Sequence, residues 1–324
     1  MRVYCSTVSV IVVSVLSKFN KMTTKINLTT PNGIELEYCF AKGIYFRAST
    51  LEHLTDGDLS KQVENVQNLP IRDDDVYLVT FPKSGTHWLW EIVCMLRKGK
   101  SEYEKDVKEV AFLDFKSTEQ IEALPSPRVI NCHYPVHLTP REIFTKGIKI
   151  IHVQRNPKDI AVSYFNHIFK FSKKPSPLKT FSDFLPLMLG SYGIDLYYPW
   201  CKYVKEWEKF SRKHPDQILN LYFEDVKENP IREIRKVNEF LGTKCSDELI
   251  ADISEACEFE NLKKADAEVK DKKAFFNHEG PSPMYRKGEV GDWKNWFTVS
   301  ESEQMDRWLS DNLTDTDLKF RYEL

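Results

Sequence analysis

The stretch from residue 76 to residue 88 constrains the fold of this chain more than any other part of the sequence. It begins with an apolar, β-rich run that stops at Pro82, and a short polar turn follows, Lys83-Ser84-Gly85-Thr86. Apolar residues at helical spacing then continue to Gly99. A strand, a turn and a helix in this order direct free backbone N–H groups and the positive end of a helix dipole toward one point. The pattern predicts a loop that binds an anion such as phosphate or sulfate.

Three later segments repeat the design of an apolar strand that ends at a polar residue. The strand over 128–133 ends at His133, the strand over 148–153 is followed by Arg155, and the strand over 218–223 is followed by two acids. Amphipathic helices are predicted after the last two, so the chain alternates strands with helices. We therefore expect an α/β protein: one domain with a central parallel β-sheet flanked by helices and a P-loop-like anion-binding loop.

The residues whose side chains are best suited to bind a ligand or to catalyse a reaction lie at the ends of these strands. Ligands of parallel α/β sheets bind outside the carboxyl ends of the strands, and Lys83, His133 and Arg155 are all predicted to lie there. A further cation pair, Arg286-Lys287, stands before Gly288 in a non-periodic stretch, which suits a loop that clamps a phosphate. The convergence predicts one shared site.

The motifs resemble those of a known family. The common phosphate loop has lysine directly after glycine, whereas here Lys83 comes two residues before Gly85. The order Pro-Lys-Ser-Gly-Thr instead resembles the 5′-phosphosulfate loop of cytosolic sulfotransferases, which use 3′-phosphoadenosine 5′-phosphosulfate (PAPS). The string over 286–295, Arg-Lys-Gly-x-x-Gly-Asp-Trp-Lys-Asn, resembles the second PAPS signature of the same family. The resemblance extends over about residues 70–324.

The resemblance implies transfer of the sulfonate group of PAPS to a hydroxyl or amine of a small apolar acceptor. His133 would act as general base, Lys83 would stabilise the leaving phosphate, Ser163 would engage Lys83 until the acceptor binds, and no metal is implied. Acceptor contacts are expected from Phe112, Phe115, Asn131 and His133; Tyr134 and Phe165 are either acceptor contacts or core residues. The positions implied to bind PAPS are Lys83, Ser84, Gly85, Thr86, His87, Trp88, Arg155, Ser163, Phe223, Cys257, Phe259, Tyr285, Arg286, Lys287 and Gly288.

Four positions depart from the family pattern. Asn131 stands where the family has a lysine two residues before the base, and Phe223 replaces a tyrosine near adenine. Glu258 replaces a small hydroxyl residue, and His87 stands where a second threonine is usual. Two alternatives to a sulfotransferase are a P-loop-like nucleotide or nucleoside kinase, which needs an acidic magnesium ligand, and an inactive nucleotide-binding protein.

Composition bounds the function further. The chain has 324 residues and a net charge of −2, which gives no global basic field for nucleic acid. Its seven cysteines include no close pair, which favours reduced thiols over disulfides or a zinc site. We expect residues 1–35 to be an N-terminal extension and residues 36–324 to be the sulfotransferase domain.

The N-terminal segment leaves two interpretations open. Residues 3–16 have the length of a signal-peptide core, and Asn27 and Asn312 stand in glycosylation tripeptides. Alternatively, synthesis begins at Met22. We expect a cytoplasmic protein without stable membrane association.

The segment from Lys294 to Glu303 matches the Lys-x-x-x-Thr-Val-x-x-x-Glu dimerisation pattern of the family. The resemblance implies a homodimer in which this segment faces its copy. The alternative is a loop that enters a helix with solvated charges at its start.

Overall fold

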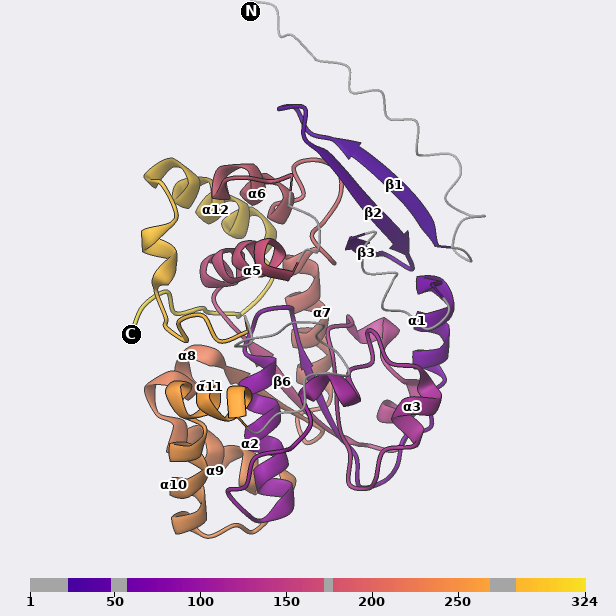
Figure 1. Ribbon diagram of the computed structural model, residues 1–324, viewed down its shortest axis with the longest axis vertical. Coiled ribbons are helices and arrows are strands. Elements are labelled where there is room, and N and C mark those ends of the chain that lie inside the picture. Colours follow the sequence, from indigo (N-terminus) through magenta and orange to yellow (C-terminus); the bar gives the residue numbers. More distant parts are fainter. Residues whose placement is uncertain (1–22, 48–56, 172–176, 269–283) are drawn as a thin grey trace, which may run out of the picture.

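A computed structural model of the chain describes residues 23–47, 57–171, 177–268 and 284–324, and Figure 1 shows their arrangement. A four-stranded parallel sheet lies at the centre, in the order β5-β4-β6-β7. Its strands are β4 (Val76–Thr80), β5 (Val129–Cys132), β6 (Lys149–Gln154) and β7 (Ile218–Tyr222). The predicted parallel α/β domain is confirmed, with one local correction: Phe223 begins a helix instead of ending β7, because the carboxyl end of the strand turns directly into α8.

Helices cover both faces of this sheet because alternate strand residues point to opposite sides. Tyr77 and Val79 join one apolar cluster with α5, α6, α7 and α12, whereas Val76 and Leu78 join a second with α2, α9 and α10. The helices are α1 (Leu59–Gln67), α2 (Thr86–Lys98), α3 (Thr118–Glu122), α4 (Arg141–Thr145), α5 (Pro157–Phe171), α6 (Phe181–Met188), α7 (Trp200–Lys213), α8 (Phe223–Glu228), α9 (Pro230–Leu241), α10 (Asp247–Ala256), α11 (Phe259–Glu268) and α12 (Val299–Asn312). The 3₁₀ helices are η3 (Lys108–Ala111), η4 (Val136–Leu138) and η5 (Asp292–Asn295).

Local sequence signals explain where several helices begin and end. The N-cap Asn229 accepts from the N–H of Arg232 and is followed by proline at the first position of α9, and Gly242 ends this helix in the left-handed conformation. Thr298 and Glu301 form a capping box at the start of α12. Local sequence signals therefore account for both ends of α9 and for the start of α12.

A second sheet precedes the central one. Strands β1 (Thr24–Thr29), β2 (Glu35–Ala41) and β3 (Ile44–Arg47) pair antiparallel in that order. The boundary expected at residue 35 falls inside the β1–β2 hairpin, so ordered structure already begins before it. The apolar stretch over residues 3–16 lies outside the described residues. In the part of the chain that the structure describes, none of the helices combines the length and the apolar character needed to span a membrane.

Candidate active site

The turn between β4 and α2 has the backbone of an anion-binding loop. Gly85 has φ +103° and precedes the first residue of α2, and Lys83 also lies in the left-handed region with φ +71°. A Cβ atom on Gly85 would stand 2.8 Å from the Phe223 ring, so both conformation and space require glycine. Ser84 Oγ is buried without a hydrogen-bond partner among the described residues. A buried hydroxyl at a helix N-terminus is suited to donate to a bound anion.

Lys83 directs its ammonium across the site toward α5. Its Nζ lies 3.3 Å from Nδ1 of His167, one helical turn beyond the predicted partner Ser163. Burial, together with the nearby charges of Lys108 and Arg155, lowers the pKa of Lys83 to about 7. An anion in the loop would reverse this effect, because it favours the charged ammonium. No sequence motif indicates His167, because its place beside Lys83 depends on how α5 packs.

His133 is held in the orientation that a general base needs. Its Nδ1 lies 2.9 Å from the carbonyl oxygen of Thr80, and because a carbonyl only accepts, Nδ1 carries the proton. Nε2 is then the unprotonated ring nitrogen. Burial, followed by the charge of Lys108, lowers the pKa of His133 well below its ordinary value. The imidazole is therefore neutral at physiological pH and able to accept a proton.

A buried polar cluster lies near His133. His87 Nε2 lies 3.0 Å from Oε1 of Glu109, and that oxygen lies 3.1 Å from Nζ of Lys108. Asn131 donates to the carbonyl oxygens of Lys108 and Ala111 at 2.9 and 3.1 Å. The amide of Asn131, predicted to contact the acceptor, thus holds η3 against β5. Lys108 and Glu109 were not predicted, because no sequence motif distinguishes them from surface charges.

A second cluster of cations gathers around Asp292, on the far side of the loop. Arg286 and Lys287 contact the two oxygens of Asp292 at 2.6 and 2.5 Å, which lowers the pKa of this otherwise desolvated carboxyl to about 2. Arg155 donates to the carbonyl oxygens of Lys83 and Glu289, each at 3.1 Å. The three predicted cations therefore converge on one region.

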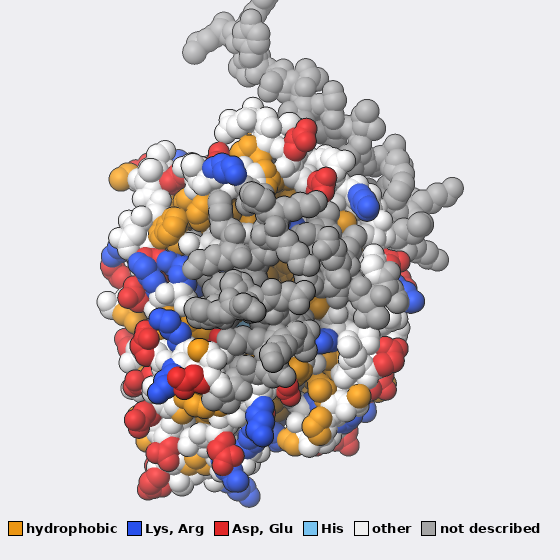
Figure 2. Space-filling view, in the orientation of Figure 1, with side chains coloured by type: hydrophobic (Ala, Val, Ile, Leu, Met, Phe, Trp, Pro, Cys, Tyr) orange, Lys and Arg blue, Asp and Glu red, His pale blue; other side chains and the backbone are white. Residues whose placement is uncertain are grey.

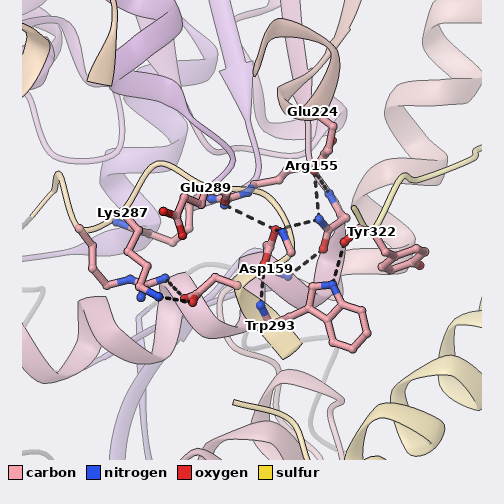
Figure 3. A network of polar contacts seen from close by, with 12 residues as sticks. Arg155, Asp159, Glu224, Lys287, Glu289, Trp293 and Tyr322 are labelled. Atoms are coloured by element: carbon pink, nitrogen blue, oxygen red, sulfur yellow. Dashed lines mark hydrogen bonds and ion pairs between the residues drawn. The ribbon is translucent and has the colours of Figure 1, made fainter. Parts of the chain in front are cut away.

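Asp159 holds this region to α5. Its carboxylate accepts from the backbone N–H groups of Gly291 and Trp293 at 2.8 and 3.0 Å, and the Trp293 indole donates to the carbonyl oxygen of Tyr322. Figure 3 shows this network between the C-terminal loop and α5. It fixes the loop that carries the predicted phosphate-binding cations.

Aromatic rings line the position predicted for adenine. The rings of Trp88 and Phe223 lie 5.4 Å apart, edge to face, and the Arg155 guanidinium lies 4.1 Å from the centre of the Phe223 ring. Gly288 approaches Phe259 so closely that a Cβ atom would stand 2.2 Å from that ring. The ring of Tyr285 lies 6.2 Å from that of Phe259.

Cys257 lies in the apolar cluster under α2. Its thiol is buried, and its sulfur lies 3.8 Å from that of Met95. Trp88 and Tyr285, two other predicted nucleotide contacts, pack against the same cluster. The contact between Cys257 and the nucleotide stays a prediction.

Of the predicted acceptor contacts, Phe112 lies beside His133. Its ring centre is 5.0 Å from that of His133 and 5.2 Å from that of Phe115. Tyr134 is fully buried, and Phe165 packs against Phe181 and Trp296, so both belong to the core. The acceptor side of His133 is thus apolar and aromatic.

Ser84 Oγ, Trp88 Nε1 and Arg155 Nε are buried donor atoms around the loop that have no hydrogen-bond partner among the residues that the structure describes. Such atoms fit a polyanionic nucleotide, which would supply the acceptors. Within the described ranges, no group of three or more His, Cys, Asp or Glu side chains could hold a metal ion. On the face in Figure 2, acidic and basic side chains intermingle over the described residues, so the cations of the site form a local field.

Comparison with known proteins agrees with this geometry. A family model described as "Sulfotransferase domain" matches residues 73–317. Sulfotransferase 1A1 of Rattus norvegicus is 36% identical over 278 residues, which cover 80% of this chain and 91% of the relative. Sulfotransferase 1E1 of Bos taurus is 37% identical over 283 residues, which cover 82% and 92%.

Solved structures show the same fold. Mouse sulfotransferase SULT7A1, complexed with PAP, has a TM-score of 0.68 and 25% identity, with 86% of this chain and 95% of that chain covered. Retinol dehydratase, in a complex with retinol and PAP, has a TM-score of 0.69 and 22% identity, with 92% of each chain covered. The predicted enzyme class, a PAPS-dependent sulfotransferase, is confirmed, and the kinase and inactive-protein alternatives are set aside. The chain belongs to the sulfotransferase family.

Proposed function

We propose that the protein transfers the sulfonate group of PAPS to the hydroxyl, or the amine, of a small apolar acceptor. His133 Nε2 takes the acceptor proton while the acceptor oxygen bonds to sulfur. The bond from sulfur to the bridging oxygen breaks, and its electron pair stays on the departing phosphate. Lys83 stabilises the charge that develops there.

One observation carries the assignment of His133: the Thr80 carbonyl accepts from Nδ1 at 2.9 Å and leaves Nε2 as the base. Lys83 is supported by its place in the loop and by its lowered pKa, which indicates a desolvated ammonium ready to pair with an anion. Ser163 lies on the same face of α5 as His167, the residue that Lys83 reaches. We assign to His167 the resting contact with Lys83 that was predicted for Ser163.

The nucleotide contacts follow from the same geometry. The PAP bound by the mouse relative is PAPS without its sulfonate group, and we propose the same ligand here. Ser84, Thr86 and the first turn of α2 would hold the 5′-phosphosulfate. The 3′-phosphate would compete with Asp292 for Arg286 and Lys287, and adenine would stack against Trp88 and lie near Phe223 and Phe259.

Transfer of labelled sulfonate tests this function. The protein is incubated with [35S]PAPS and, separately, 2-naphthol, a steroid alcohol and an aryl amine. We expect labelled product with at least one acceptor and none in its absence. Hydrolysis of PAPS without transfer to any acceptor would contradict the proposal.

Assembly and location are also proposed. The exposed Val299, at the start of α12, fits a contact between two copies. We further propose a cytoplasmic protein in which residues 1–21 play no part in catalysis. A glycan on Asn27 in protein from eukaryotic cells would refute that location.

A further inference from the structure

Lys108 is a buried cation that the proposed mechanism leaves unused. Its side chain is 4% exposed, and its Nζ lies 3.1 Å from Glu109 Oε1 and 3.4 Å from Asn131 Oδ1. The same ammonium lies 3.8 Å from the centre of the Phe112 ring. Burying a lysine has a desolvation cost in folding free energy. A protein with an apolar side chain of similar volume in its place is often equally stable or more stable. Its presence here calls for a role other than stability.

The surrounding contacts do not need this ammonium as an anchor. The amide of Asn131 already binds the carbonyl oxygens of Lys108 and Ala111, and so fixes η3 to β5. Glu109 separately reaches His87 on α2 at 3.0 Å. The segment is therefore held by contacts that do not involve the Lys108 side chain.

The charge of Lys108 lies near both proposed catalytic groups, Lys83 and His133. Its ammonium lies 3.8 Å from the centre of the Phe112 ring, and that ring centre lies 5.0 Å from the centre of the His133 ring. Through Glu109 and His87 it is also linked to the loop that follows Lys83. After burial, the charge of Lys108 is the strongest influence that lowers the pKa of both Lys83 and His133. The sulfonate must pass between these two residues.

We propose that Lys108 is a second catalytic cation, which donates to the sulfonate oxygens while the group moves from the nucleotide to the acceptor. This inference rests on the proposed function and deepens it. Glu109 and Asn131 hold the ammonium in place before the substrates arrive, so little reorganisation is needed during the reaction. Lys108 changes no bond in the proposed reaction. The bond from sulfur to the bridging oxygen of PAPS still breaks, the bond from the acceptor to sulfur still forms, and His133 still accepts the proton.

The test compares variants of Lys108 with a matched buried lysine. Lys158 is 3% exposed, pairs with Asp306 at 2.7 Å and lies 4.5 Å from the centre of the Trp293 ring, so it offers the same kinds of contact away from the base. We expect Lys108→Met to lower kcat by about 10²-fold and to change the Kd for PAP by less than about threefold. Lys108→Arg should retain much more activity, and Lys158→Met should keep kcat within about threefold of the unmodified protein.

A double variant separates catalysis from folding. Lys108→Met with Glu109→Gln removes both buried charges together, so no unpaired carboxylate is left in the interior. We expect a folded protein that binds PAP and stays about 10²-fold slow. Normal kcat in this variant or in Lys108→Met overturns the proposal, as does a loss of PAP affinity that matches the loss of kcat. If the unmodified protein binds PAP but transfers no sulfonate, the proposed function itself fails, and this inference fails with it.

Discussion

The Nδ1 atom of His133 lies 2.9 Å from the carbonyl oxygen of Thr80, the last residue of the neighbouring strand β4. The same strand leads directly into the anion-binding loop, so one strand both orients the base and starts the loop. Parallel pairing of β4 with β5 sets the distance between them. The anion-binding loop and His133 are thus joined through two paired strands of the central sheet.

Nucleotide binding should take up a proton at Lys83. In the free protein its pKa is lowered to about 7, so near pH 8 the amine is mostly neutral. A bound anion raises this pKa, and the folded complex must then gain a proton. Calorimetry with PAP in buffers of different ionisation enthalpy should show net proton uptake near pH 8. Equal uptake in Lys83→Met would show that the proton goes elsewhere.

Arg286 should distinguish nucleotides by their 3′-phosphate. Arg286→Ala is expected to weaken the binding of PAP more than the binding of AMP. The difference in binding free energy should be about 1.5–3 kcal/mol, because a charged hydrogen bond is lost. Lys236→Ala, which removes a surface lysine paired with Glu233, is the control and should alter neither affinity. If calorimetry shows equal weakening of AMP and PAP by Arg286→Ala, this residue does not read that phosphate.

Gly288→Ala should affect nucleotide binding beyond its cost in stability. Gly288 has φ +65°, and an added Cβ would stand 2.2 Å from the Phe259 ring, which must then move. Gly242 has φ +66° with nothing within 4 Å of an added Cβ, so Gly242→Ala measures backbone strain alone. Both substitutions should lower the free energy of unfolding by about 1–2 kcal/mol. Only Gly288→Ala should also lower the affinity for PAP. Unchanged PAP affinity in Gly288→Ala would separate this contact from the nucleotide site.

Val299→Glu should convert dimers to monomers. Val299 is 78% exposed, and in a two-fold contact the introduced carboxylates would meet across the axis. Light scattering should show the change, and PAP binding should be kept. Ile231→Glu, at another exposed apolar position on α9, should leave the oligomeric state unchanged. An unmodified protein that is monomeric at tens of micromolar would contradict the proposed dimer.

Segments with a local signal were predictable from the sequence. Three of the four central strands are followed closely by a proline, a histidine or an Asn-Pro pair, and these signals predict Lys83, His133 and Arg155 at one edge of the sheet. Residues 25–29 alternate polar and apolar and an Asn-Gly turn follows, which is a local signal for the β1–β2 hairpin. The extension expected over residues 1–35 does not take this signal into account.

Residues that depend on tertiary packing were not predictable in this way. His167 meets Lys83 only because α5 crosses the loop, and Lys108 is buried only because η3 packs on β5. Asn131 was predicted to contact the acceptor, and in the structure its amide donates to the carbonyl oxygens of Lys108 and Ala111 in η3. The direction in which a side chain points within a site depends on neighbouring residues that are distant in the sequence. The hydrophobic periodicity of the sequence does not show which residues those are.

The central claim is that His133 is the base of a sulfonate transfer, and steady-state kcat of His133→Ala tests it most directly. With a working acceptor and saturating [35S]PAPS, we expect kcat to fall by about 10²-fold or more, because the acceptor proton has no receiver. PAP affinity should remain near that of the unmodified protein, which shows that the site is intact. Turnover of His133→Ala close to that of the unmodified protein would contradict the account.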